Sequence, residues 1–187
     1  MKKLFMMFAF VAVLAVGFNA SAQTAPSFDN VQVTARSHDF TSSNDVGAAV
    51  SVEKSLGSTL FVLGSVNRTY LKDARTTDFR AGLGARFELN DGLAAYGDAY
   101  ALHVGNVNFK DGRSYGYGAE AGLRDLIGNI QLTAAVNPER AVYNAGWTTY
   151  GKLGAQLNVT KHLAVVADFK YHDQAHKVAN LGVAYNF

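Results

Sequence analysis

The stretch that decides the fold is FRAGLGARFEL, residues 79–89. Its odd positions carry only Phe, Ala and Leu, whereas its even positions carry Arg, Gly and Glu. A period of two residues is typical of a β-strand with one apolar and one polar face. We therefore predict a strand here, and the same alternation returns in the segments 46–53, 115–124, 149–159 and 165–172.

Turn-forming residues divide the rest of the chain at even intervals. Short turn segments occupy 55–58, 90–92, 128–129 and 160–162. Longer polar segments lie midway between them, at 41–45, 72–75, 106–113, 144–146 and 173–175. These connections predict an all-β, antiparallel, up-and-down barrel of ten strands, with eight strands as the alternative. Strands of about 10 to 13 residues suit a tilted membrane-spanning strand, which needs roughly 9 to 11.

The N-terminus has the order of a secretory signal peptide. Lys2 and Lys3 precede an apolar run from Leu4 to Phe18, and small residues follow at 20–22. We predict that residues 1–22 are cleaved and that residues 23–187 form a single barrel domain in the bacterial outer membrane. No other apolar run approaches the roughly 18 residues of a spanning helix, which excludes a helical membrane bundle.

Composition excludes several functional classes. Without Lys2 and Lys3 the chain has 15 basic and 15 acidic residues, so it offers no basic surface for nucleic acid. The absence of cysteine excludes disulfides, thiolate nucleophiles and cysteine-based metal sites. We expect no cofactor.

A soluble β-sandwich also alternates, so period alone does not decide between water and lipid. The export signal, the strand length and the absence of proline from the membrane-length part of every predicted strand favour the membrane.

The last residues resemble a known signal. Leu181, Val183, Tyr185 and Phe187 are apolar at every second position and end on a terminal Phe. This ending resembles the C-terminal assembly signal of Gram-negative outer-membrane β-barrel proteins, and the chain is similar in size to the small OmpA/OmpX/opacity-type barrels. The resemblance implies periplasmic chaperones and the barrel assembly machinery as partners during biogenesis, and outer-membrane lipids around a monomeric barrel.

Aromatic residues gather near the predicted strand ends, as in the two interfacial belts of membrane barrels. The belt at the long-loop end would hold Tyr70, Phe79, Tyr115, Trp147 and Tyr171, and the belt at the tight-turn end Phe28, Phe87, Tyr185 and Phe187.

The polar strand faces predict a charged lumen. Alternation places eleven charged side chains inside: Arg36, Glu53, Arg80, Arg86, Glu88, Asp98, Glu120, Arg124, Lys152, Asp168 and Lys170. Strand pairing sets Asp98 beside Glu120 and Lys152 beside Lys170. Because like charges side by side are unfavourable, we predict that the acidic pair engages the basic pair across the lumen. A change of parity in the fifth strand predicts a β-bulge near Leu102.

The histidines suggest catalysis or metal binding only weakly. His38–Asp39 lies near Ser42 and Ser43, and His172–Asp173 lies near His176, but a strand sends adjacent side chains to opposite faces and no third group is in place. We predict that the protein is not an enzyme and holds no metal.

The functional prediction is a narrow pore for ions or small polar solutes, or a closed envelope-structural barrel. The alternative is a surface-interaction protein, an adhesin or a lipopolysaccharide-binding protein, and an outer-membrane hydrolase ranks below it. Near the outer rim, Arg68 and Lys72 are the hypothetical contacts to lipopolysaccharide phosphates.

Overall fold

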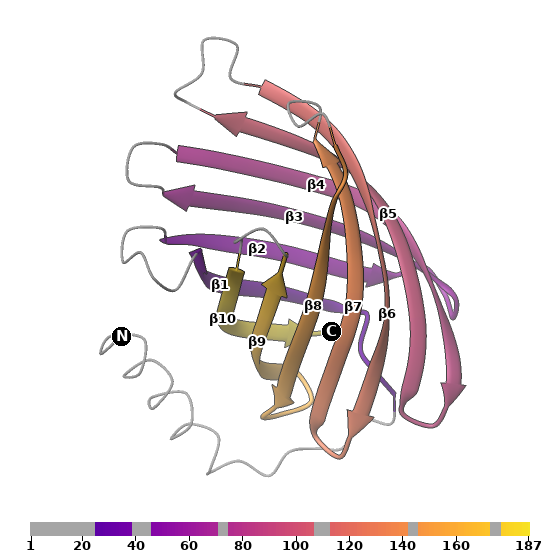
Figure 1. The fold of residues 1–187 in the computed structure, drawn as a ribbon. Helices are drawn as coiled ribbons and strands as arrows, with labels where there is room; N and C mark the ends of the chain where they lie inside the picture. The colour runs from indigo at the N-terminus through magenta and orange to yellow at the C-terminus, as the bar shows by residue number, and fades with distance from the viewer. Residues whose placement is uncertain (1–24, 39–45, 71–74, 107–112, 142–145, 173–176) are drawn as a thin grey trace.

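The protein is a closed barrel of ten antiparallel strands (Figure 1). The computed structural model describes residues 25–38, 46–70, 75–106, 113–141, 146–172 and 177–187. Each strand pairs with its neighbours in sequence, and the first strand pairs with the last, so the sheet has no free edge. The strands are β1 (Asn30–His38), β2 (Val46–Ser55), β3 (Leu60–Tyr70), β4 (Arg75–Asn90), β5 (Leu93–Asn106), β6 (Arg113–Ile127), β7 (Ile130–Ala141), β8 (Thr148–Asn158), β9 (Leu163–Tyr171) and β10 (Lys177–Asn186).

The prediction of ten strands is confirmed, and the eight-stranded alternative is wrong. All four predicted tight turns lie between consecutive strands, and three of them contain a glycine at positive φ: Gly57, Gly92 and Gly128. The five predicted polar loops fall mostly, and the signal peptide wholly, outside the described residues. In the described part of the chain every regular element is a strand, and no helix there is long and apolar enough to cross a membrane.

The distribution of side chains is the reverse of that in a soluble barrel. Leu83 and Leu153 on the outer surface are 64% and 63% exposed, whereas Arg124 and Glu120 inside are 5% and 8% exposed. Exposed leucine and enclosed charge are favourable only when the surroundings are lipid and the interior is polar. The fold is therefore a transmembrane β-barrel.

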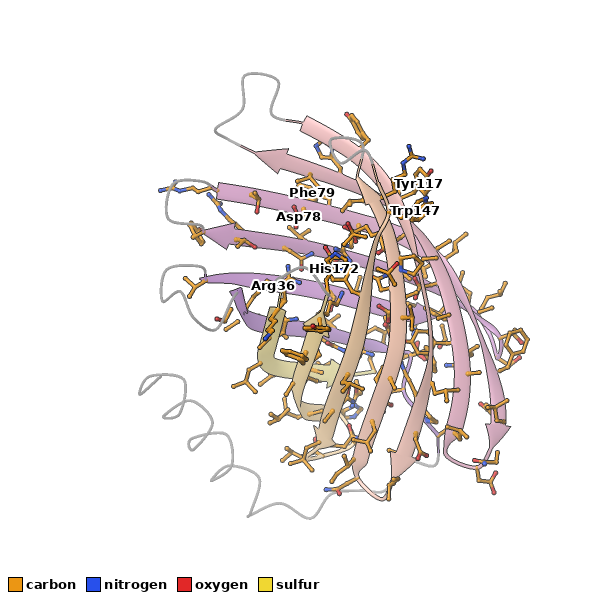
Figure 2. All side chains as sticks on the ribbon, viewed as in Figure 1. Arg36, Asp78, Phe79, Tyr117, Trp147 and His172 are labelled. Carbon is orange, nitrogen blue, oxygen red and sulfur yellow. The ribbon has the colours of Figure 1, made fainter. Side chains whose placement is uncertain are left out.

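The aromatic belts follow the sequence prediction with one exception. All five residues predicted for the loop-side belt are exposed, and Trp147 packs edge-on against Tyr117 at 5.3 Å between ring centroids (Figure 2). At the turn side Phe87, Tyr185 and Phe187 are exposed as well. Phe28 is not in a belt: it is 1% exposed and lies inside the barrel.

The predicted bulge near Leu102 is wrong. The pairing of β5 with β4 and β6 runs through Leu102 without interruption, and the one register shift in this region lies between Glu88 and Asn90, next to the turn. Parity is therefore unbroken: Leu102 faces the lumen and is 3% exposed. His103 lies between Phe79 and Tyr115, with ring centroids 6.2 Å and 4.7 Å away.

Candidate functional site

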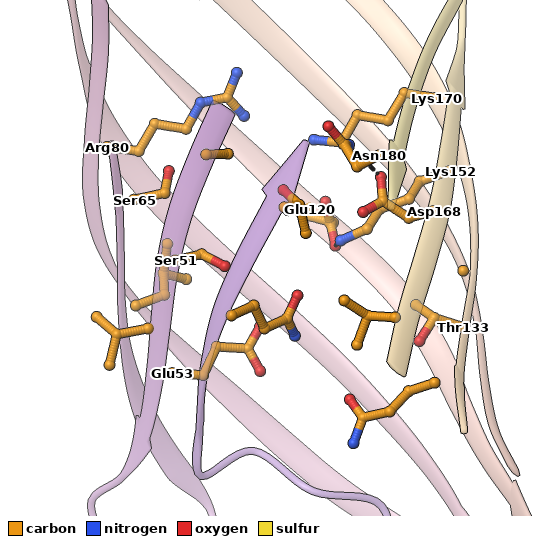
Figure 3. Close-up of a pocket in the computed structure, with 18 of the residues that line it drawn as sticks. Ser51, Glu53, Ser65, Arg80, Glu120, Thr133, Lys152, Asp168, Lys170 and Asn180 are labelled. Atoms are coloured by element: carbon orange, nitrogen blue, oxygen red, sulfur yellow. Dashed lines mark hydrogen bonds and ion pairs between the residues drawn. The ribbon is translucent and has the colours of Figure 1, made fainter. Parts of the chain in front are cut away.

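The candidate site is a cavity of about 180 Å³ inside the barrel, lined by residues from all ten strands. Nine of the eleven charged residues predicted for the lumen line it. Figure 3 shows Arg80 and Lys170 at one end of the cavity and Glu53 toward the other. The charges face one cavity because period-two alternation turns the polar face of every strand inward.

Arg86 and Glu88 are the two predicted residues that do not line this cavity. Both lie on β4, between the cavity-lining Arg80 and the β4–β5 turn. Arg86 donates from Nε to the carbonyl oxygen of Ser58 at 2.9 Å and from Nη1 to Oγ of Ser55 at 3.1 Å, so it holds the β2–β3 turn. Glu88 is exposed. Parity gives the face of a strand but not the depth along it.

The predicted neighbours of like charge are present. Asp98 pairs with Glu120 in the β5–β6 ladder, and Lys152 pairs with Lys170 in the β8–β9 ladder. Lys152 Nζ on β8 lies 2.8 Å from Glu120 Oε1 on β6. This ion pair spans the intervening strand β7. Tyr96 also donates to the Glu120 carboxylate, at 2.6 Å. One acid of the acidic pair thus engages one base of the basic pair.

Four charges of the cavity lining form no salt bridge within the described residues, and two of them are connected through Asn180. Arg36 Nε donates to Asn180 Oδ1 at 3.0 Å, and Asn180 Nδ2 donates to Asp168 Oδ1 at 2.7 Å. Among the residues that the structure describes, neither Asp98 nor Lys170 forms a salt bridge. Both line the cavity, where water can solvate them.

Arg124 forms the floor of the cavity. Its two terminal nitrogens lie 2.7 Å and 2.8 Å from the two carboxylate oxygens of Glu53, a bidentate ion pair. The guanidinium also stacks near two rings, at 4.1 Å from the centroid of Phe28 and 4.7 Å from that of Tyr96. Arg124 therefore connects the charged lumen to the segment that precedes β1.

That segment, residues 25–29, crosses the turn-side mouth of the barrel. Phe28 packs against Phe61 and Tyr96, with ring centroids 5.1 Å and 5.9 Å away. The backbone N–H of Ser27 donates to Gln131 Oε1 at 2.7 Å, and the Ser27 carbonyl accepts from Arg124 at 2.9 Å. These contacts place an apolar ring inside the lumen at its turn-side end.

Asp29 fixes the end of this segment to β2. Its carboxylate accepts hydrogen bonds from the backbone N–H and the hydroxyl of Ser55, at 3.0 Å and 2.6 Å, and lies 2.9 Å from Lys54 Nζ. Partial burial acts to raise the pKa of this carboxyl, but the contacts with Ser55 and Lys54 outweigh burial and hold the pKa below its ordinary value. Asp29 is therefore ionised near neutral pH.

At the loop side of the cavity, Arg80 and Tyr100 meet Glu139, a residue that the sequence prediction missed. Arg80 Nη2 lies 2.9 Å from Glu139 Oε2, and Tyr100 donates to the same oxygen at 3.0 Å. Asn137 donates to the Tyr100 hydroxyl at 2.8 Å. Parity counted from Gln131 along β7 would have placed Glu139 inside, past Pro138.

The described histidines lie on different strands or connections. His162 Nδ1 lies 2.9 Å from the carbonyl oxygen of Asn186, and His172 Nδ1 lies 2.8 Å from that of Thr149. The described residues contain no group of three side chains that could hold a metal ion. Several candidates lie outside the described residues, as Lys72 does: Asp39, Ser42, Ser43, Asp173 and His176.

An up-and-down barrel with a lipid-facing exterior and a charged lumen defines the class of outer-membrane β-barrel proteins. Among solved structures, the chain is similar to a KdgM porin in complex with disordered oligogalacturonate, with a TM-score of 0.52 and 8% identity over 84% of this chain and 99% of that one. A structure of the NanC porin has a TM-score of 0.52 and 10% identity, over the same shares of the two chains. A second KdgM porin structure has a TM-score of 0.50 and 7% identity, again covering 84% and 99%.

These structural neighbours are porins, and at this level of identity the likeness shows the fold alone. No family model and no curated protein matches the sequence.

Proposed function

We propose that the protein is a narrow pore of the bacterial outer membrane for ions and small polar solutes. The observation that carries the proposal is the charged cavity that all ten strands line. A lumen of mixed charge accommodates small polar solutes without a strong preference of sign. One structural neighbour is described with an oligogalacturonate, but a cavity of about 180 Å³ favours much smaller solutes here.

In this conformation the pore is closed at its turn side by Phe28. An apolar ring that fills a polar passage blocks ions because it leaves no room for their hydration water. Residues 25–28 precede β1 and lie outside the strand ladder, whereas the Asp29 carbonyl accepts a hydrogen bond from the Phe187 N–H at 3.2 Å, next to the last pair of β1 and β10. Residues 25–28 can therefore leave the mouth while all strand pairs stay intact, which makes them suited to serve as a gate.

The test is single-channel recording in planar bilayers, after heat-modifiable migration on a gel has shown that each barrel is folded. The variants are Phe28→Ala and, as a matched control, Phe87→Ala. Phe87 lies near the same turn-side end but is 61% exposed on the outer surface. We expect larger or more frequent current steps from Phe28→Ala than from the wild type, and no change from Phe87→Ala.

The outcomes separate the pore from its gate. Steps of equal size and frequency in all three proteins would support the pore and refute the role of Phe28. Folded but silent barrels, including Phe28→Ala, would refute the pore.

A closed envelope-structural barrel is the second candidate, and the ion pairs of the lumen favour it. Glu53–Arg124, Glu120–Lys152 and Arg80–Glu139 connect strands that are not neighbours in the sheet. Such cross-braces stiffen the wall and fill the lumen, which suits a barrel that transports nothing. Silent bilayers with a folded Phe28→Ala variant would support this candidate.

A further inference from the structure

The outer surface carries positive charge at its loop-side edge. Arg68 and Tyr70 are exposed on the lipid-facing side of β3, and Arg75 is exposed directly across the ladder from Tyr70. The guanidinium carbons of Arg68 and Arg75 lie 5.3 Å and 5.7 Å from the centroid of the Tyr70 ring. Two cations therefore flank one ring that faces outward; we call these three residues the Tyr70 cluster.

The same arrangement recurs elsewhere on this edge. Lys177 on β10 is the ladder partner of Tyr171 on β9, and its Nζ lies 5.9 Å from the centroid of the Tyr171 ring. Arg140, on β7, is a further exposed cation at the loop-side end. The recurrence on separate hairpins indicates that the positive edge is a property of the barrel surface and not of one strand.

No acidic residue in the described part of the chain forms a salt bridge with these cations. Salt bridges among the described residues involve Lys54, Arg80, Arg124 and Lys152, and none involves the four cations of this edge. Of the acids near this end that the structure describes, Asp78 and Glu139 lie at the inward-facing parity of their strands, and Glu139 pairs with Arg80. At the turn side, by contrast, Lys54 pairs with Asp29.

The position of the Tyr70 cluster along the barrel axis identifies the layer of the membrane that it contacts. Tyr70 belongs to the aromatic belt of Phe79, Tyr115, Trp147 and Tyr171, and such belts lie at the level of lipid headgroups. Short turns face the periplasm and longer connections face outside in bacterial barrels, so this belt lies in the outer leaflet. Guanidinium groups are the side chains best suited to phosphate oxygens.

From this placement we propose that the Tyr70 cluster binds the phosphate groups of lipopolysaccharide, with Lys177 and Tyr171 as a second contact. The ring supports the guanidinium stems, and each guanidinium supplies paired hydrogen-bond donors to a phosphate group. This proposal shares the outer-membrane location with the proposed function but does not depend on conduction, so either can fail without the other.

The experiment measures retention of purified lipopolysaccharide by the refolded full chain after washing. The test variant is Arg68→Gln with Arg75→Gln, and the matched control is Lys54→Gln with Lys161→Gln, which removes two exposed cations from the turn side. Heat-modifiable migration checks that each barrel is folded. We expect retention to fall at least about tenfold in the test variant, since each pair of charge-assisted bonds is lost, and to stay unchanged in the control.

Two further measurements test whether the arginines recognise phosphate groups. Arg68→Lys with Arg75→Lys keeps the charge but loses the planar fork, so retention between that of the wild type and that of the Gln variant is expected. Dephosphorylated lipopolysaccharide is expected to bind as weakly to the wild type as intact lipopolysaccharide binds to the Gln variant. Equal retention by wild type and Gln variant, or effective competition by phosphatidylglycerol vesicles, would overturn the proposal.

Discussion

Arg124 is the residue on which the interior depends most. It is 5% exposed, it pairs with Glu53 through both terminal nitrogens, and it packs against the ring of Phe28. A buried guanidinium without its carboxylate retains the full cost of desolvation. The stability of the turn-side half of the barrel should therefore depend strongly on Glu53.

Adjacent residues of β2 give a matched test of this dependence. Glu53→Met removes the acceptors at similar volume, and we expect a loss of about 3 kcal/mol in the free energy of unfolding. Lys54→Met removes the exposed partner of Asp29, where a loss below about 1 kcal/mol is expected. Denaturant unfolding of the barrels in lipid vesicles measures both, and equal losses would contradict the assignment of Arg124 as the main brace.

Single positions show how well the parity of a residue along its strand predicts where its side chain lies. Parity places Arg124 and Glu53 inside correctly because each lies well within a regular strand. The belt prediction, not parity, fails for Phe28: it shares the even parity of the lumen-lining Gln32 and Thr34, and it packs inside against Phe61 and Tyr96. Parity gives the correct face for Arg86 but not its depth, because depth depends on where the turn ends.

Between neighbouring strands, large rings lie opposite glycines. Phe61 on β3 pairs with Gly84 on β4, and Tyr100 on β5 pairs with Gly118 on β6. A Cβ built on either glycine would collide with the facing ring. The inward glycines therefore admit the rings that narrow the lumen at two heights.

Gly84→Ala should force the Phe61 ring out of place and destabilise the barrel by about 1 to 3 kcal/mol, the usual cost of overpacking. Gly151→Ala on β8 is the control, because a Cβ there meets no atom within 4 Å. Denaturant unfolding in vesicles provides the comparison. If Gly84→Ala left the free energy of unfolding unchanged, Phe61 would have to move freely. That result would argue against tight packing of Phe61 with Phe28 at the turn-side end.

Strand number, turns and faces could be predicted because each depends on short-range pattern. The bulge predicted near Leu102 is wrong because an apolar residue at an inward position breaks the chemical pattern without breaking the backbone register. Leu102 is tolerated in the lumen since it is 3% exposed and so excludes water instead of facing it.

Across the whole molecule, the cavity carries nearly balanced charge. Its lining holds five basic residues, Arg36, Arg80, Arg124, Lys152 and Lys170, against four acidic ones, Glu53, Asp98, Glu120 and Asp168. Arg80, Arg124 and Lys152 are in ion pairs and Arg36 donates to Asn180, whereas Lys170 has no salt bridge within the described ranges. Lys170 should therefore dominate the preference of the pore for one sign of ion.

In the Phe28→Ala background we expect a weak preference for anions, and Lys170→Glu should reverse it because the acids then outnumber the bases. The reversal potential in a salt gradient measures the preference. Lys161→Glu makes the same change of charge on the exposed β8–β9 turn, outside the cavity lining, and should leave the sign unchanged. A reversal potential that Lys170→Glu does not shift would place the conduction path elsewhere.

The sequence alone established the barrel class, the number of strands and the inward face of most strands, because period-two alternation and turn chemistry act over a few residues. Only the tertiary structure decided which interior charges meet, since Glu120 reaches Lys152 past β7 and Arg80 reaches Glu139 through the closure and tilt of the sheet. It also decided that Phe28 lies inside the lumen, because that position depends on packing against Phe61 and Tyr96, which are distant in sequence.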